Sequence, residues 1–186
     1  MHHKVPGTSI PYDGNHSLFE KYRPLIEAAD GLTLSQVCSV TGLEPSTIQN
    51  WVKRRFVSRP VNKKYRERQL ARILLISSLR HCMKLEQIGE LMTIVNGDAD
   101  DTSDDIISEE QMYDYLCIVT AQASESNATS SQIPGIVKRV ISGYQPTQSD
   151  AMQRLESVLT IMTYAYISGL YKKEAERLYN SLTNKE

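Results

Sequence analysis

The sequence lacks several features that would assign it to a well-defined class. No stretch approaches about 18 consecutive apolar residues, and residues 1–14 lack the apolar run of a signal peptide. We therefore expect a soluble, cytoplasmic protein without a membrane contact. The chain has only three cysteines, Cys38, Cys82 and Cys117, which lie far apart among apolar neighbours. This pattern favours reduced, buried thiols over disulfides or metal ligands.

Motifs of the common enzyme classes are also missing. The chain has no glycine-rich phosphate loop, no HExxH pair, no nucleophile elbow and no cysteine pair at zinc-ligand spacing. Of its four histidines, His2 and His3 lie at the very start of the sequence. We expect no catalytic residues, no metal and no cofactor, and a protein that is not an enzyme. A triad assembled from distant Ser, His and Asp residues stays open at this stage.

Positive charge is absent from a long part of the chain and concentrated in another. From Leu85 to Val137 there is no Lys or Arg, whereas eleven acidic residues occur there. From Lys53 to Arg72 there are nine Lys or Arg and one acidic residue, Glu67. The formal net charge of −1 therefore conceals a basic segment followed by an acidic one. Such a basic segment is typical of a surface that binds a polyanion; the alternatives are a solvated face and pairing with acidic residues elsewhere.

The spacing of apolar residues predicts a mainly all-α chain. Helices are expected over 17–31 with an interruption near Pro24, and over 35–41, 45–54, 67–80, 85–96, 108–124 and 150–182, the last with a break at Gly169. Residues 55–64 favour an extended loop or short hairpin, and 124–135 a polar linker. Residues 98–109 have a passing likeness to a calcium loop, but Ser103 stands where the turn needs glycine, so a solvated linker is favoured.

Residues 35–54 have the spacing of a helix-turn-helix. Cys38 is small enough for a close crossing, Gly42 can adopt a positive φ in the turn, and Ile48 can anchor the second helix. The other apolar contacts between the two helices are assigned to Val37, Leu43 and Trp51. An ordinary helical hairpin is the alternative.

Burial of Ile48 and Trp51 would turn the polar side chains of the second helix outward. These side chains are Thr47, Gln49, Asn50, Lys53 and Arg54. Asn and Gln can pair with adenine, and Lys and Arg with guanine or phosphate. The second helix is therefore predicted to read the bases of DNA.

The order of these elements resembles the winged-helix DNA-binding domain of MerR-type transcriptional regulators. The matching stretches, between residues 32 and 96, are LTLSQVCSVTGLEPSTIQNWVKRRFVSRP, KKYRERQLARILLISSLR and KLEQIGELM. TIQNWVKRRFV, NKKY and ARILLI also resemble a bacterial family of small candidate regulators catalogued only as domain of unknown function 1836. The resemblance implies a MerR-like winged helix-turn-helix domain with additional C-terminal helices. It also implies binding to double-stranded DNA, with no established effector.

The resemblance also implies roles for individual residues. Gln49, Asn50 and Lys53 would enter the major groove. Phosphate contacts of the wing would come from Arg55, Arg59, Lys63, Lys64, Tyr65 and Arg66. The chain departs from the family at Arg66, where a Ser or Thr cap is usual. It also departs in the acidic loop, helix and linker that precede the long C-terminal helix.

Four segments follow from this interpretation. They are an extended N-terminal arm (1–16), the DNA-binding domain (17–97), an acidic loop with a helix and polar linker (98–149), and a C-terminal helical region (150–186). An apolar stripe from Met152 to Tyr166 suits either the core or a dimer seam, and we expect a homodimer through the C-terminal helices.

The predicted function is that of a sequence-specific DNA-binding transcriptional regulator. The alternative is a winged-helix module whose basic face docks an acidic protein without reading DNA. A related hypothesis is that the acidic segment 98–110 covers the basic face and inhibits DNA binding. The sequence indicates neither the operator nor an effector ligand.

Overall fold

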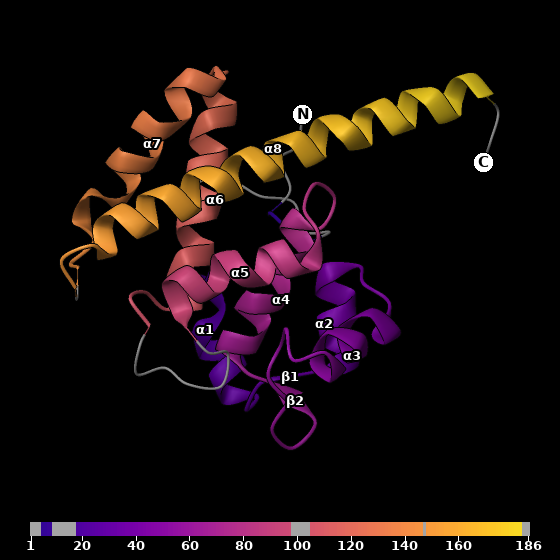
Figure 1. Ribbon diagram of the computed structural model, residues 1–186. Coiled ribbons are helices and arrows are strands. Elements are labelled where there is room, and N and C mark those ends of the chain that lie inside the picture. Colours follow the sequence, from indigo (N-terminus) through magenta and orange to yellow (C-terminus); the bar gives the residue numbers. More distant parts are fainter. Residues whose placement is uncertain (1–4, 9–17, 98–104, 147, 184–186) are drawn as a thin grey trace.

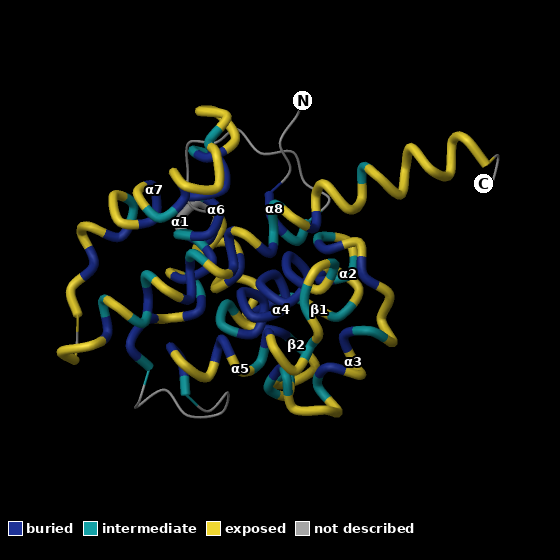
Figure 2. The backbone as a smooth tube through the Cα atoms, turned by 45° about the horizontal axis from the view of Figure 1, so that its top comes forward, coloured by how far each residue is buried: buried dark blue, intermediate teal, exposed yellow. Residues whose placement is uncertain are grey.

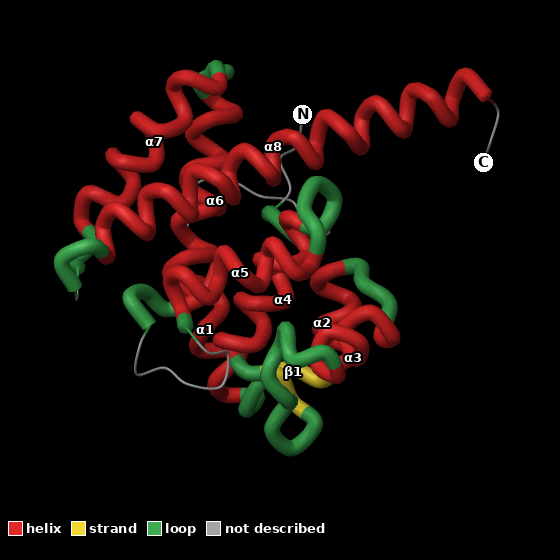
Figure 3. The backbone as a smooth tube through the Cα atoms, in the orientation of Figure 1, coloured by secondary structure: helices red, strands yellow, loops and turns green. Residues whose placement is uncertain are grey.

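The computed structural model describes residues 5–8, 18–97, 105–146 and 148–183. Within these residues the chain is mainly helical, as predicted (Figure 3). The helices are α1 (Leu18–Ala28), α2 (Leu34–Thr41), α3 (Pro45–Lys53), α4 (Glu67–Leu79), α5 (Leu85–Asn96), α6 (Glu109–Glu125), α7 (Ile133–Val140) and α8 (Ala151–Thr183). Two short strands, β1 (Leu32–Thr33) and β2 (Lys64–Tyr65), pair antiparallel with Leu32 opposite Tyr65. No helix among these is both long enough and apolar enough to span a bilayer.

Helix α4 lies at the centre of the molecule (Figure 2). Every residue from Gln69 to Leu79 is buried, because other elements cover this helix on all sides instead of along one face. It contacts α1, α2 and α5 from the N-terminal part of the chain and α6 and α8 from the C-terminal part. The two parts therefore share one hydrophobic core, and α4 links the elements that pack on it.

Helices α2 and α3 meet at the turn that the sequence predicts. The Thr33 hydroxyl accepts a hydrogen bond from the Gln36 backbone N–H, and the Gln36 side chain accepts one from the Thr33 N–H, so a capping box begins α2. Gly42 ends α2 with φ 70°, the expected left-handed turn. Pro45 occupies the first turn of α3, where its missing N–H costs nothing.

The assigned contact residues of the two helices are largely buried. Val37, Leu43, Ile48 and Trp51 lie in the core, and Cys38 is half-buried. Cys117 is fully buried and its thiol pKa is raised by desolvation, but Cys82 is exposed. The prediction of a buried thiol is therefore wrong for Cys82, which lies in the exposed turn between α4 and α5.

Three expectations about helix boundaries are corrected by the structure. Helix α1 continues through Pro24, and α8 continues through Gly169. A side chain at Gly169 would lie against the Cβ of His81, so this glycine permits close packing of α8 on the body. Helix α7 begins inside the predicted polar linker (124–135) and continues beyond it, because Pro134 falls in its first turn and the apolar residues Ile136 and Val137 pack inward.

Residues 5–8 of the predicted N-terminal arm are packed against the body. Val5 and Pro6 are buried, and the Tyr113 hydroxyl on α6 donates a 2.7 Å hydrogen bond to the Pro6 carbonyl. Gly7 has φ 73°, and a side chain there would collide with the Leu74 carbonyl of α4. This part of the arm is therefore an internal contact, whereas residues 9–16 and Ser17, the first residue of the helix expected over 17–31, lie outside the described residues.

Candidate nucleic-acid interface

Helix α3 presents polar side chains on the face opposite its buried residues. Ile48 and Trp51 point into the core, so Gln49, Asn50 and Lys53 are exposed. Arg54, the C-cap residue, is also exposed, whereas Thr47 is half-buried. The face predicted to read bases therefore exists as a solvent-facing surface, with Thr47 at its margin.

Arg55, which follows the C-cap residue of α3, has a backbone conformation that is unusual for a residue other than glycine. The Phe56 N–H donates to the Trp51 carbonyl at 2.9 Å and the Arg55 N–H donates to the Val52 carbonyl at 3.1 Å. These two bonds form a Schellman motif, in which glycine is the usual residue at the left-handed position. Arg55 has φ 63°, which costs an L-residue about 1 kcal/mol. An exposed cation thus occupies a glycine position.

A second cation, Lys63, also has a positive φ, at the tip of the following loop. The backbones of Val61 and Lys64 exchange hydrogen bonds of 3.0 and 2.9 Å around Asn62 and Lys63. Asn62 has φ 51° and Lys63 has φ 63°, so the turn is of type I′. Asn suits such a turn, but glycine is the usual residue at the position of Lys63.

The loop between α3 and β2 is fastened to the body by buried groups. Val57 is buried, and Phe56 packs so closely on α5 that a side chain at Gly89 would come within 3.0 Å of its ring. The buried Gln69 side chain donates to the Arg59 carbonyl at 2.6 Å and accepts from the Arg66 N–H at 2.8 Å. Gln69 therefore also caps the start of α4, where Arg66 replaces the usual Ser or Thr.

Four of the predicted surface cations make no ion pair within the described parts of the chain. They are Lys53, Arg55, Arg59 and Lys63, all exposed. We call these four residues the open cations. They lie on α3, at its end and along the loop, so exposed cations follow the exposed amides of α3 along the chain to the tip of the hairpin.

Three other predicted contact residues have intramolecular partners. Arg54 pairs with Glu86 at 2.5 Å and lies 5.0 Å from the centre of the Phe56 ring. A backbone hydrogen bond and the bond from Arg54 hold the pKa of Glu86 below its usual range, so this acid is ionised at neutral pH. Arg66 pairs with Asp30 at 2.8 Å, and the Lys64 ammonium donates to the Ala29 carbonyl. Arg54 and Arg66 remain exposed, but a ligand would compete with these acids.

Tyr65 does not belong to the surface. Its exposed fraction is 3%, and burial raises the pKa of its hydroxyl. Tyr65 pairs with Leu32 in the small sheet and contributes to the core. Its expected contact with phosphate is therefore corrected, because alternation along β2 turns Tyr65 inward and Lys64 outward.

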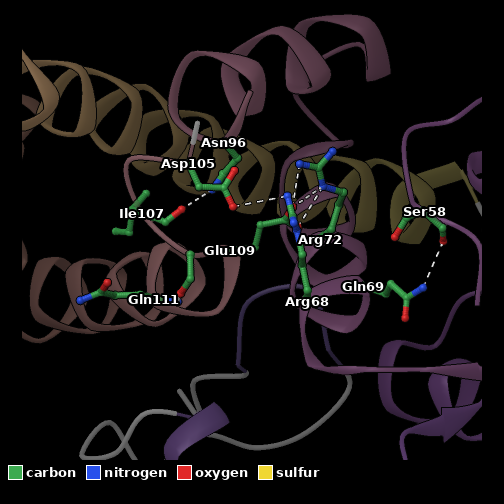
Figure 4. Close-up of polar contacts among 10 residues, drawn as sticks. Ser58, Arg68, Gln69, Arg72, Asn96, Asp105, Ile107, Glu109 and Gln111 are labelled. Atoms are coloured by element: carbon green, nitrogen blue, oxygen red, sulfur yellow. Dashed lines mark hydrogen bonds and ion pairs between the residues drawn. The ribbon is translucent and has the colours of Figure 1, made fainter. Parts of the chain in front are cut away.

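The end of the basic segment turns away from this surface into the protein. Figure 4 shows Arg68 and Arg72 of α4 converging on Glu109 at the start of α6. The Arg72 guanidinium approaches Glu109 to 2.7 Å, with side chains 8% and 1% exposed. Arg68 pairs with Glu109 at 3.1 Å and with Asp105 at 3.4 Å. These two arginines are structural cations, which is the pairing alternative that the sequence left open.

Glu109 is the residue that sequence reasoning missed in this network. A signal exists, since Arg68 and Arg72 are four residues apart and so are Asp105 and Glu109. Ser108, the first residue of the helix expected over 108–124, is the N-cap of α6, because its hydroxyl accepts a hydrogen bond from the Gln111 N–H at 3.2 Å. Of the hypothetical inhibitory segment, Asp105 and Glu109 contact α4, whereas residues 98–104, which begin the calcium-like stretch 98–109, lie outside the described residues.

The part of the chain that is similar to known proteins contains both this surface and the Arg72–Glu109 pair. Residues 27–116 match the family described as "Domain of unknown function (DUF1836)". The expected resemblance to this DUF1836 family is thereby confirmed, whereas the MerR-like assignment stays a prediction.

A protein of Bacillus subtilis (strain 168), "Uncharacterized protein YkrK", is 32% identical over 90 residues, which is 46% of this chain and 39% of that protein. The chain thus spans about two-fifths of this curated relative. No solved structure matches the chain significantly.

Proposed function

We propose that the protein is a sequence-specific DNA-binding transcriptional regulator that uses α3 and the loop of residues 55–63 as a MerR-like winged helix-turn-helix. The observation that carries this proposal is the position of the open cations beside the exposed amides of Gln49 and Asn50. Cations neutralise phosphates, and Asn or Gln can bond both N6 and N7 of adenine in the major groove. Helix α3 and the loop that follows it supply both kinds of group as exposed side chains.

The backbone conformations of Arg55 and Lys63 support the same function. Both residues have φ 63° at positions where glycine would remove the strain. Residues that remain in strained conformations point to a functional requirement, since stability alone would favour glycine. A phosphate contact is a requirement that a cation satisfies and glycine does not.

The attachment of the loop favours recognition with a small entropic cost. Val57, Phe56 and the Gln69 side chain hold its backbone on α4 and α5 before any ligand arrives. A site whose supporting groups are fixed loses little conformational freedom on binding. The open cations therefore need only their side chains ordered.

The direct test is fluorescence anisotropy with the DNA upstream of the protein's own gene and with a scrambled duplex, over about 50–300 mM salt. If all four open cations neutralise phosphates, log K falls with log salt at a slope of about −4 per protomer. A preference for the upstream duplex that persists at high salt supports the proposal. Equal binding to both duplexes would overturn it, and favour the docking of an acidic protein on this surface.

Two sets of variants separate base contacts from phosphate contacts. Asn50→Ala or Gln49→Ala is expected to cost about 1–3 kcal/mol on the preferred duplex and to reduce sequence preference. Lys53→Ala is expected to weaken binding to both duplexes alike and to reduce the salt slope by about 1. Arg139→Ala removes an exposed cation on α7 and serves as the matched control. Identical behaviour of the two sets would contradict the division into base and phosphate contacts.

A further inference from the structure

The C-terminal half of α8 exposes an unusual amount of apolar surface. Seven of the exposed large apolar side chains lie on this helix: Ile161, Tyr164, Leu170, Tyr171, Leu178, Tyr179 and Leu182. Tyr171 is 75% exposed and Leu182 is 84% exposed. The last buried residue of α8 is Gly169, and beyond it the helix projects from the body as an exposed rod (Figures 1 and 2). Solubility alone does not explain these side chains, because an exposed helix end is ordinarily polar.

The exposed residues follow the spacing of a helix-helix seam. Positions separated alternately by three and four residues are all exposed: Ile161, Tyr164, Ser168, Tyr171, Ala175, Leu178 and Leu182. We call these residues the outer seam. This is the heptad spacing that keeps one stripe facing a partner helix. The outer seam therefore has the periodicity of a packed surface, but from residue 170 onward it has no packed partner among the described residues of its own chain.

The outer seam is distinct from the stripe that the sequence offered as a dimer contact. Leu155, Leu159 and Met162 of that earlier stripe are fully buried against the protein's own helices. The earlier stripe is thus intramolecular core, and it is not a dimer seam. Tyr164 of the outer seam donates a hydrogen bond to the Ser130 carbonyl, so the outer seam begins while α8 still lies on the body.

A helix end of this kind gains stability from being covered. Residues 170–183 continue α8 with nearly all side chains exposed, and isolated helices shorter than about 12–15 residues are marginal in water. Their charges within the helix add little, since the exposed pair of Arg177 with Glu174 is of the type that contributes a few tenths of a kcal/mol. Packing along the outer seam is the larger source of helical stability.

We propose that a second copy of this chain covers the outer seam, so that two α8 helices pair along it. The charges beside the outer seam are nearly balanced: the three cations Lys172, Lys173 and Arg177 accompany the two acids Glu174 and Glu176. This balance selects neither an acidic nor a basic partner, but it is compatible with an identical helix. In a parallel pair the flanking contacts would join Glu174 to Tyr179 and Ile167 to Lys172 of the other copy, with no like charges facing. An identical helix also matches the outer seam over its full length.

The pairing has a consequence for the molecule that does not depend on DNA. A symmetric contact places the same surface on both copies, and the two bodies are then held on one shared axis. If the proposed function holds as well, the pair carries two α3 helices for two half-sites.

The test is sedimentation equilibrium of the full chain without DNA, over a wide range of micromolar concentrations. We expect a mass of twice the 21.1 kDa of one chain. Leu178→Glu, and separately Tyr171→Glu, should weaken association at least 100-fold by placing charge in the outer seam. Asn180→Glu is the matched control, because it adds the same charge two residues away at a position outside the outer seam.

Each result decides the proposal. A monomer at every concentration would overturn it, as would a dimer that Leu178→Glu and Tyr171→Glu leave intact or one that Asn180→Glu disrupts equally. Thermal unfolding of the body should remain unchanged in Leu178→Glu, since Leu178 contacts no buried element in the described structure. Because DNA is absent, a failure of the proposed DNA binding would not affect this measurement.

Discussion

The two ends of the basic segment place the same kinds of side chain in opposite environments. Lys53, Arg55, Arg59 and Lys63 face solvent without an ion pair in the described structure, whereas Arg68 and Arg72 enter the protein and meet Glu109. Sequence proximity does not distinguish them, because Lys63 and Arg68 are five residues apart. The difference arises from α4, whose side chains are buried on every face, and from an acid 37 residues beyond Arg72. The density of Lys and Arg along the sequence therefore overstates the number of cations that are open to a ligand.

The largest expected effect follows from removing the buried acid. Glu109→Gln leaves Arg72 charged and nearly inaccessible to water, which should lower the free energy of unfolding by about 3–5 kcal/mol. Urea unfolding followed by circular dichroism measures this change. Glu110→Gln alters the neighbouring, partly exposed acid and should change stability by less than about 0.5 kcal/mol. A loss below about 1 kcal/mol in Glu109→Gln would show that Arg72 does not depend on this pair.

The second prediction addresses the solvent-facing end. Lys53→Ala combined with Arg59→Ala should leave stability within about 0.5 kcal/mol of the parent, because neither residue has an ion-pair partner in the described structure. If the proposed function is correct, the salt slope of DNA binding should become less negative by about 2. Anisotropy titrations and urea unfolding report the two quantities separately. A lower free energy of unfolding without a change in the salt slope would show that Lys53 and Arg59 are structural cations, like Arg68 and Arg72.

Arg55 offers a test in which stability and binding change in opposite directions. Arg55→Gly should raise the free energy of unfolding by about 0.5–1 kcal/mol, because glycine adopts φ 63° without strain. The same change should weaken DNA binding several-fold through the loss of one phosphate contact. Arg55→Lys keeps the charge and the strain, and is the control for both measurements. A loss of both stability and affinity in Arg55→Gly would show that the side chain is structural.

The smallest expected effect concerns Tyr65. Because its side chain is 3% exposed, Tyr65→Phe should leave the salt slope of DNA binding unchanged. The free energy of unfolding should fall by no more than about 1 kcal/mol, since only a hydroxyl is removed from this core position. A slope reduced by about 1 would restore Tyr65 to the contact surface.

Local signals predicted much of the fold. The apolar spacing of α4, the glycine of the turn at Gly42 and the start of the helix at Ser108 each depend on neighbouring residues, so they can be read from the sequence. Helix α7 was missed because Pro134 and Gly135 signal a break, although proline is compatible with a first helical turn. The two-residue strand β1 is too short to leave a periodic pattern.

The candidate surface was predictable in outline and not in detail. The exposed face of α3 follows from helical spacing around Ile48 and Trp51. The left-handed conformations of Arg55 and Lys63 could not be expected, because the residue types argue against them. The removal of Arg68 and Arg72 from the surface depends on the tertiary contact between α4 and α6; the matching four-residue spacings of the two arginines and of Asp105 and Glu109 do not by themselves show that these helices meet.

The hydrogen bond from Tyr113 to Pro6 has a consequence for how the chain reaches its fold. It joins residues 107 positions apart, so it is among the least local contacts of the molecule. Contacts of such separation are costly in chain entropy until the intervening elements are in place. Residues 5–8 leave the ribosome well before α6, and they acquire their partner only when more than half of the described chain has been synthesised. We therefore expect their docking to be a late folding event, with amide protection of this segment arising after that of α4.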